Sequence, residues 1–346
     1  MLEQLMQNIN DLWKLFLRPS RQVYTAMDLG IFPSFFFLLV NSLLLYLGPD
    51  KFLIANQSFI RKDFSIRNRN GLLLQASWFC PLKSYQRRPF VIYCHCNSGS
   101  RVEALPYAKT LLSNGFGLCC FDFSGSGCSE GDYVTLGYNE TDDLQIIVTM
   151  LRESNLAEEI FIWGRSMGAV TALNYILKYK DSKISGLILD SPYCNLRNLA
   201  LELGQNSIKL PKFMLNPIID SIEKKIKKRA RFNLNMMNLI PLFKMQENLN
   251  TPAFFITSLK DKVVAPYHVE ELKKLWGKEA TLKYIDLEHY ENRGDKIVDE
   301  CINFLKSHMK GRKRSNSFSN NAQIKCIPIP NEILLKPVNR IKMYRK

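Results

Sequence analysis

The feature that most restricts the fold is the alternation of short β-rich segments and longer helix-like segments between residues 59 and 310. The β-rich segments are Phe59–Ile66, Leu72–Phe79, Phe90–His95, Phe116–Phe121, Ile160–Gly164, Gly186–Asp190, Ala253–Ser258 and Leu282–Asp286. The helix-like segments are Arg101–Ser113, Asn139–Ser154, Met167–Lys180, His268–Trp276 and Asp295–His308. This pattern predicts an α/β fold with a mostly parallel sheet of about eight strands and helices on both faces. The first two strands, joined by the turn at Asn68–Gly71, are expected to form an antiparallel edge.

Residues 196–240 interrupt this alternation between two of the predicted strands. Their pattern is helical, and they carry a basic cluster of Lys224, Lys225, Lys227, Lys228, Arg229 and Arg231. An insertion at this place predicts a helical lid. We interpret the basic cluster as a solvated helix face, with a rim that attracts anions as the alternative.

The net charge of +15 is concentrated at the carboxyl end. Residues 311–346 contain nine Lys or Arg and one Glu, a net charge of +8, which leaves +7 for residues 1–310. The charge therefore does not imply a nucleic-acid-binding domain. We expect a disordered, solvated basic tail, and peripheral contact of this tail with an anionic membrane is the alternative.

The chain has nine cysteines, an odd number, and most lie in apolar runs rather than at regular loop spacings. This usage predicts free thiols in a reducing, cytoplasmic compartment. The segment Cys94-His95-Cys96 has metal-ligating residue types. Successive residues of a strand point to opposite faces, however, so the histidine and the two thiols cannot converge and no metal site is predicted.

A Gly-x-Ser-x-Gly sequence, Gly164-Arg165-Ser166-Met167-Gly168, lies between a predicted strand and a predicted helix. Glycine is needed on both flanks because the serine sits on a strained strand-to-helix turn where side chains would collide. This context predicts that Ser166 is a nucleophile.

A nucleophilic serine needs a histidine base, and the chain has four histidines. His289 follows the last predicted strand in a polar loop, which is where a general base belongs. His95 precedes the serine, His268 begins a helix and His308 lies in the last helix. We therefore predict His289 as the base.

The acid that orients this histidine should follow a strand between the serine and the histidine. Asp261 follows Ala253–Ser258 and is favoured. Asp190 follows the preceding predicted strand and is the alternative, since the end of that strand also reaches a histidine.

Negative charge on a substrate carbonyl oxygen requires backbone N–H donors. One predicted donor is the amide of Met167, the residue after the nucleophile. The other lies in the loop after Phe90–His95, where Asn97 is favoured.

From about Phe59 to Met309 the chain resembles the α/β-hydrolases, in the group described as serine aminopeptidase-like (S33) or Bem46-like, and is similar to its cytosolic protist members. The matching segments are His95–Arg101, Asp122–Gly131, Gly164–Ala169, Leu189–Pro192 and Lys260–His268. The resemblance implies the α/β-hydrolase fold and a triad of Ser166, Asp261 and His289.

The same resemblance implies oxyanion donors at Asn97 and Met167. The chain departs from the family at two places: Cys96 replaces the usual glycine after the histidine of that loop, and Tyr290-Glu291-Asn292-Arg293 replaces the usual Asn-Ser-Pro-Arg.

Three parts follow: an N-terminal extension (1–58), the α/β-hydrolase domain (59–310) and the tail (311–346). Similar proteins have an Asp-Leu-Gly-Pro run, whereas here Asp28-Leu29-Gly30 and Gly48-Pro49 bracket an uncharged stretch. We interpret residues 31–48 as a translated intron. A membrane-associated segment is the alternative, although the stretch is short for a span of about 20 residues.

These expectations predict a serine hydrolase that cleaves ester, thioester or amide bonds of a small-molecule or acylated substrate through an acyl-enzyme. Esters and thioesters are favoured, and the chemistry needs no metal or organic cofactor. The alternative is a non-catalytic binding or scaffold protein with the same fold.

Overall fold

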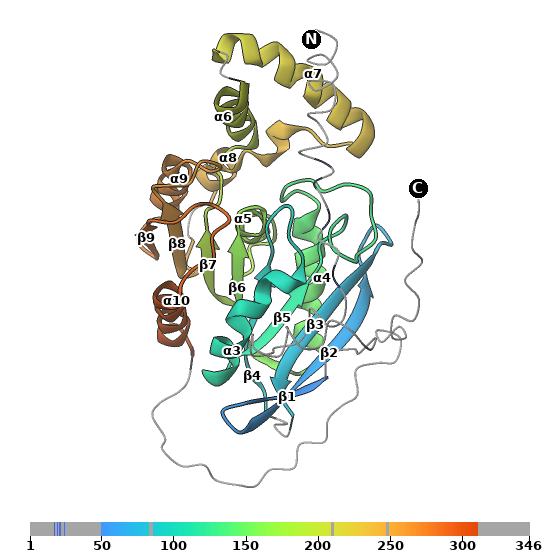
Figure 1. Cartoon of the computed structure of the whole chain (residues 1–346), viewed down its shortest axis with the longest axis vertical. Helices are drawn as coiled ribbons and strands as arrows, with labels where there is room; N and C mark the ends of the chain where they lie inside the picture. Colours follow the sequence, from blue (N-terminus) through green and yellow to red (C-terminus); the bar gives the residue numbers. More distant parts are fainter. Residues whose placement is uncertain are drawn as a thin grey trace, which may run out of the picture.

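The computed structural model describes residues 50–310, except 83–85, 209–210 and 247–248, together with Leu17, Pro19, Arg21 and Tyr24. Within these residues one nine-stranded sheet has the order β1-β2-β3-β5-β4-β6-β7-β8-β9 (Figure 1). The strands are β1 (Lys51–Ile54), β2 (Gln57–Arg67), β3 (Leu73–Pro81), β4 (Arg88–Cys94), β5 (Gly117–Phe121), β6 (Ala157–Arg165), β7 (Ile184–Asp190), β8 (Ala253–Ser258) and β9 (Ala280–Ile285). Neighbours from β5 through β4 to β9 are parallel, whereas β1, β2 and β3 pair antiparallel and join the sheet at β5. The predicted mostly parallel sheet with an antiparallel edge is confirmed.

Strand β1 was not among the strands expected from the sequence. It has only four residues, Lys-Phe-Leu-Ile, of which one is buried, and it pairs only with β2, so it is too short to show a periodic pattern. The turn between the two strands places Ala55 and Asn56 at φ values of 46° and 65°, the left-handed conformation of tight hairpin turns. The sheet therefore begins at Lys51 rather than at Phe59.

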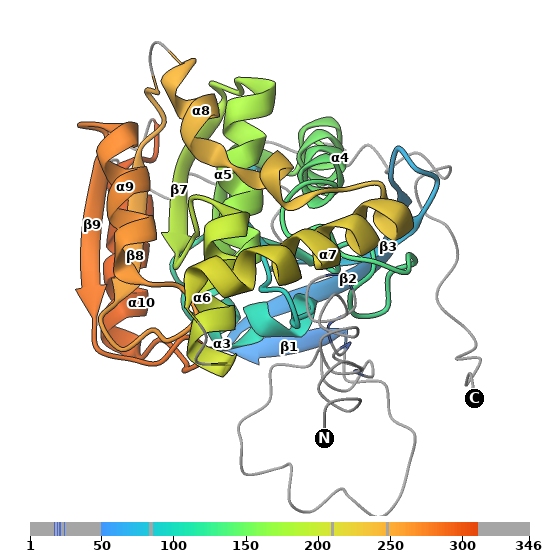
Figure 2. The same ribbon diagram turned by 90° about the horizontal axis from the view of Figure 1, so that it is seen from above.

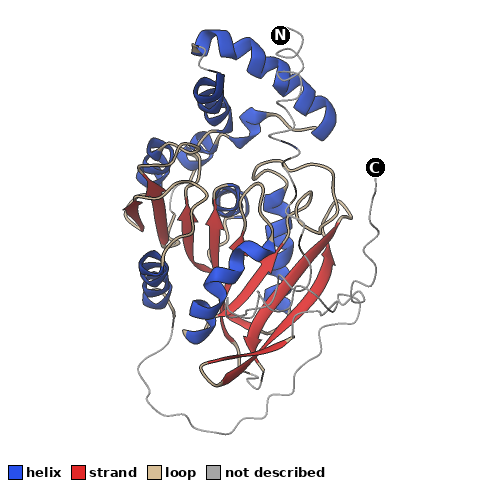
Figure 3. Cartoon of the chain, in the orientation of Figure 1, coloured by secondary structure: helices blue, strands red, loops and turns tan. Residues whose placement is uncertain are grey.

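Helices cover both faces of the sheet (Figure 3). They are η2 (Arg101–Ala104), α3 (Leu105–Ser113), α4 (Glu140–Glu153), α5 (Met167–Tyr179), α9 (Pro266–Trp276) and α10 (Asp295–Ser307). Along β4, Phe90 and Ile92 belong to the core shared with α4, α5 and α9, whereas Val91 and Tyr93 belong to the core shared with α3 and α10. A strand covered on both faces is apolar throughout rather than alternating, which is why the sequence signalled these central strands so clearly.

Between β7 and β8 the chain forms α6 (Leu196–Ile208), α7 (Lys212–Ala230), η3 (Leu234–Met237) and α8 (Leu239–Lys244). Figure 1 shows α6 and α7 beyond one end of the sheet, and Figure 2 shows α7 crossing over it. The helical insertion lies where the sequence placed it. Its function as a lid stays a prediction.

Part of the N-terminal extension packs against the domain. Leu17 is fully buried, and its carbonyl oxygen accepts a hydrogen bond of 3.0 Å from the N–H of Val134. Residues 31–48 and 311–346 lie outside the described residues, so the intron, membrane-segment and tail predictions are untested. Among the helices that the structure describes, none has the length and apolar character needed to cross a membrane.

Candidate active site

Ser166 occupies the sharp turn between β6 and α5. Its backbone has φ 49° and ψ −114°, a conformation that residues with side chains adopt only at a cost. A Cβ atom on Gly168 would lie 2.0 Å from the carbonyl oxygen of Cys94, and one on Gly164 would lie 2.4 Å from the carbonyl oxygen of Gly168. Close backbone packing therefore requires both glycines, for the steric reason expected from the sequence.

Ser166, His289 and Asp261 come together from three different loops. Nε2 of His289 lies 3.1 Å from Oγ of Ser166, and Nδ1 of His289 lies 2.6 Å from Oδ2 of Asp261. The loops follow β6, β9 and β8, whose carboxyl ends lie at one edge of the sheet. The arrangement has the order and spacing of a nucleophile, a base and an orienting acid.

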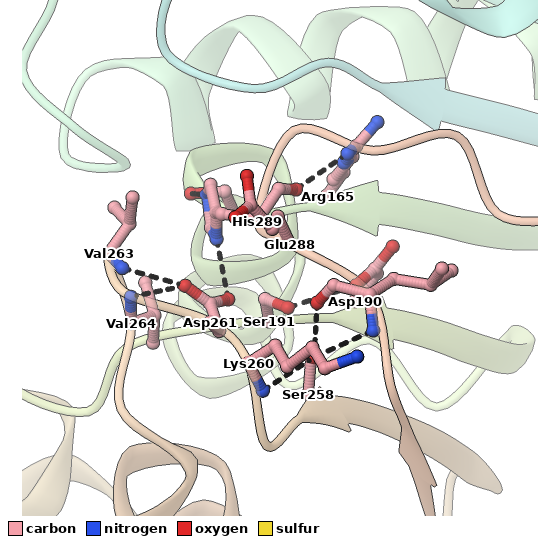
Figure 4. A network of polar contacts seen from close by, with 12 residues as sticks. Arg165, Asp190, Ser191, Ser258, Lys260, Asp261, Val263, Val264, Glu288 and His289 are labelled. Atoms are coloured by element: carbon pink, nitrogen blue, oxygen red, sulfur yellow. Dashed lines mark hydrogen bonds and ion pairs between the residues drawn. The ribbon is translucent and has the colours of Figure 1, made fainter.

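Asp261 is held by its own loop as well as by the histidine. Its Oδ1 accepts hydrogen bonds of 2.8 Å from the N–H groups of Val263 and Val264 (Figure 4). Burial by itself raises the pKa of Asp261, but the hydrogen bond and charge of His289 and the two backbone donors together hold this pKa below its ordinary value. The side chain is therefore a carboxylate at neutral pH.

Asp190, the alternative acid, is engaged elsewhere. Its Oδ2 accepts a hydrogen bond of 2.8 Å from Nε of Arg293, and its Oδ1 accepts one of 3.0 Å from Nη2. The two side chains are 1% and 0% exposed. This bidentate pair occupies both carboxylate oxygens, which favours Asp261 as the acid.

Two arginines hold the loop that carries His289. Nη2 of Arg165 donates to the carbonyl oxygen of His289 at 2.6 Å (Figure 4) and to that of Glu291 at 2.9 Å. Nη1 of Arg293 donates to those of Glu288 and Glu291, both at 3.0 Å. Sequence reasoning missed both arginines, whose only signal was their position beside the serine and four residues after the histidine.

We expect Asp190→Asn to lower the free energy of unfolding by about 3–5 kcal/mol, because it leaves the buried guanidinium of Arg293 without its counter-charge. Urea denaturation followed by tryptophan fluorescence measures the change. Asp286→Asn is the matched control: Asp286 pairs with Lys260 at 2.9 Å, and these side chains are 72% and 58% exposed. Loss of such an exposed pair costs at most about 1 kcal/mol, so equal losses in the two variants would contradict the prediction.

The two expected oxyanion donors belong to segments that touch each other. Met167 is the first residue of α5, and Asn97 follows β4. The absence of a side chain at Gly168 lets the first turn of α5 rest against the carbonyl oxygens of Cys94 and His95. Within the described residues, Oδ1 of Asn97 is buried and has no hydrogen-bond partner.

Glu103, which sequence reasoning also missed, anchors the loop after β4. Its Oε2 accepts a hydrogen bond of 3.1 Å from the N–H of Cys96, and its Oε1 accepts one of 2.9 Å from the hydroxyl of Tyr93. Burial raises the pKa of the Cys96 thiol well above its ordinary value. The side chain that replaces the family's glycine is thus accommodated as a buried, neutral thiol.

The other three histidines, His95, His268 and His308, lie outside this arrangement. His268 stands between Sγ of Cys194 and Oε2 of Glu202, each 3.1 Å from one of its ring nitrogens. The contacts from Cys194 through His268 to Glu202 also have the order nucleophile, base, acid. The Cys194 thiol is fully buried, however, and burial raises its pKa to about 12, so it is protonated and inaccessible.

A cavity of about 540 Å³ lies beside the site, within the size range of small-molecule pockets. Its walls include residues adjacent in sequence to Asn97, Ser166 and His289, namely Cys96, Ser98, Arg165 and Tyr290. Glu103 and Tyr107 also line it. In the part of the chain that the structure describes, the cysteines are free thiols and no group of His, Cys, Asp and Glu is arranged to hold a metal.

Residues 86–237 match the family described as serine aminopeptidase, S33. The protein YqkD of Bacillus subtilis is 26% identical over 218 residues, which cover 61% of this chain and 69% of YqkD. Lysophosphatidylserine lipase ABHD12 of Danio rerio is 32% identical over 137 residues, 38% of this chain and 35% of the lipase. Protein bem46 of Schizosaccharomyces pombe is 26% identical over 137 residues, 39% of this chain and 45% of bem46. The chain thus spans less than half the length of the last two relatives.

Solved structures agree in fold. The esterase Pf2001 of Pyrococcus furiosus has a TM-score of 0.57 at 22% identity, over 72% of this chain and 94% of the esterase. Est1E of Butyrivibrio proteoclasticus has a TM-score of 0.54 at 15% identity, over 70% of this chain and 98% of Est1E. The chain is therefore an α/β-hydrolase, related to esterases and lipases. Within that class it is similar to the Bem46-like serine hydrolases.

Proposed function

We propose that the protein hydrolyses an acyl ester or thioester through a covalent acyl-enzyme on Ser166. The observation that carries the proposal is the position of His289, whose ring nitrogens lie 3.1 Å from Oγ of Ser166 and 2.6 Å from Oδ2 of Asp261. A serine hydroxyl becomes a nucleophile only when a base takes its proton. This geometry supports His289 as the base and Asp261 as the group that orients it.

In the first half of the reaction, Oγ of Ser166 attacks the substrate carbonyl carbon and its proton moves to Nε2 of His289. The carboxylate of Asp261 stabilises the imidazolium that forms. His289 then donates the proton to the leaving alcohol or thiol, and the acyl group stays on Ser166. In the second half, a water molecule attacks the acyl-enzyme and gives a proton to Nε2 of His289; the bond between the acyl carbon and Oγ of Ser166 then breaks, His289 returns the proton to Oγ, and the carboxylic acid leaves.

The oxyanion that forms at each attack needs donors that are already in place. We assign this role to the N–H groups of Met167 and Asn97. Their support is the contact between the first turn of α5 and the loop after β4, and the anchoring of that loop by Glu103.

The names of the relatives favour an ester as substrate. One similar protein is a lysophosphatidylserine lipase and one similar structure is the esterase Pf2001. The family described as serine aminopeptidase leaves amide hydrolysis as the less favoured reaction. We further propose that residues 196–240 act as a lid over the substrate and that the basic residues of 311–346 make peripheral contact with anionic lipid.

A fluorophosphonate probe, which reacts with activated serines, tests the proposal. We expect stoichiometric labelling of the full chain, with the adduct mapped by mass spectrometry to the peptide that contains Ser166. Ser166→Ala should abolish labelling. Ser191→Ala is the matched control, since Ser191 is buried at the end of the neighbouring strand β7 and hydrogen-bonds to Asp190. Labelling that persists in Ser166→Ala would overturn the assignment of the nucleophile.

A further inference from the structure

Helix α7 has two opposite faces of different chemistry. Its inner face consists of Leu215, Ile219, Ile222 and Ile226, all at most 4% exposed. The residues at helical spacing on the other face are exposed: Phe213, Pro217, Asp220, Lys224 and Lys228, followed by Arg231 at the end of the helix. Figure 1 shows α7 at the extremity of the described structure, on the far side of α6 from the sheet. Among the described residues, no other element covers the outer face of α7.

Apolar side chains are exposed at the first turn of this helix. Phe213 is 74% exposed and the adjacent Met214 is 47% exposed. A large aromatic side chain that is mostly in water loses the free energy it would gain by burial. Its place beside a basic stripe is typical of helices that lie in the interface of a membrane.

The two acidic residues of α7 do not offset its basic charge at the outer surface. Arg197 of α6 binds both of them, with N···O distances of 2.6 Å to Asp220 and 2.9 Å to Glu223. In the described part of the chain, Lys224 and Lys228 form no salt bridge with any acidic side chain. The outer face consequently presents unneutralised positive charge next to exposed apolar groups.

We propose that the outer face of α7, formed by Phe213, Met214, Lys224, Lys228 and Arg231, binds the surface of an anionic lipid bilayer. The lysines and the arginine meet the negative lipid headgroups, and the side chains of Phe213 and Met214 enter the boundary with the acyl chains. This surface is distinct from the basic tail.

The position of α7 means that membrane binding would also orient the active site. The helix follows β7 through α6, so it stands beyond the edge of the sheet at which Ser166 and His289 lie. Binding through α7 turns that edge toward the bilayer, where acyl esters of lipids reside. This orientation rests on the proposed function, whereas the binding itself does not.

Co-sedimentation with vesicles tests the proposal on the full chain, with phosphatidylcholine vesicles compared with vesicles that also contain phosphatidylserine. We expect binding only to the anionic vesicles. The double variant Lys224→Gln/Lys228→Gln should weaken the partition constant about 25-fold, because each basic residue near an anionic surface contributes a factor of about five. Phe213→Ser should weaken it as well. Lys274→Gln/Lys278→Gln, which removes two exposed lysines near the start of β9, should leave it unchanged.

The outcomes separate this proposal from the catalytic one. Ser166→Ala should bind the vesicles as the wild type does, and circular dichroism shows that the α7 variants are folded. Equal binding by all variants, or no binding by any, overturns the proposal. A loss in the lysine variant without a loss in Phe213→Ser also overturns it, because the surface would then fit an acidic macromolecule held by charge alone.

Discussion

Replacement of His289 by alanine is expected to lower kcat for an activated ester by a factor on the order of 10⁶. In a site of this kind the loss of the base costs about as much as the loss of the whole triad, because the serine proton then has no acceptor. The imidazole of His289 is the only one that lies beside Ser166 in the described residues, with 3.1 Å between Nε2 and Oγ. Steady-state kinetics with a p-nitrophenyl ester measures the effect, and kcat should fall while KM changes little.

His268→Ala is the matched control for this experiment. His268 is fully buried and bonded to a carboxylate, Glu202, as His289 is to Asp261, but its partner on the other side is the Cys194 thiol. We expect a loss of stability and, per folded molecule, a kcat within several-fold of the wild type. If His268→Ala lost as much kcat as His289→Ala, or if His289→Ala kept its turnover, the assignment of the base would be wrong.

Asp261→Asn is expected to lower kcat about 10⁴-fold, since an amide in place of the carboxylate selects the wrong tautomer of the histidine and cannot stabilise an imidazolium. The 2.6 Å contact between Oδ2 of Asp261 and Nδ1 of His289 is the basis for this magnitude.

The pKa of Asp261 lies below its ordinary value. Its contribution to stability is therefore complete above its unfolded pKa of about 4 and is lost only as the pH falls through the lower folded value.

Asp190→Asn separates the two candidate acids. Because Asp190 binds Arg293, which in turn holds the carbonyl oxygens of the His289 loop, this variant should lose stability and only secondarily activity. Kinetic measurements under conditions where both variants are folded, checked by circular dichroism, compare them directly. A larger loss of kcat in Asp190→Asn than in Asp261→Asn would reverse the assignment.

Much of the fold was predictable because its signals are local. The strands β4 to β8 are apolar runs covered on both faces, and the helices between them carry a repeating apolar face. The turn at Ser166 was predictable for the same reason, since the two flanking glycines indicate a backbone that is packed too closely for side chains. Strand β1 escaped prediction because its identity depends on pairing with β2 rather than on its own apolar pattern.

The order of residues along the chain was enough to name Ser166, Asp261 and His289 as candidates. The ends of the predicted strands, the polar loop and the order serine, aspartate, histidine can all be read from the amino-acid sequence. The order of residues could not predict which groups the charged side chains around the site bind. The pairing of Asp190 with Arg293, and the bond from Arg165 to the carbonyl oxygen of His289, join residues more than 100 positions apart in the chain. A buried charge pairs with whichever side chain or backbone group the fold places next to it. Local sequence cannot identify that partner when the partner lies far away in the chain.

The sequence by itself therefore determined the class of fold, the strained turn and the candidate nucleophile, base and acid. The tertiary structure alone decided how the loop after His289 is held, what a cysteine does in place of the family's glycine, and which face of α7 is turned outward. The physical reason is the same throughout. Backbone geometry and hydrophobic periodicity act over a few residues, whereas the neutralisation of charge and the exposure of a helix face are settled only when distant segments meet.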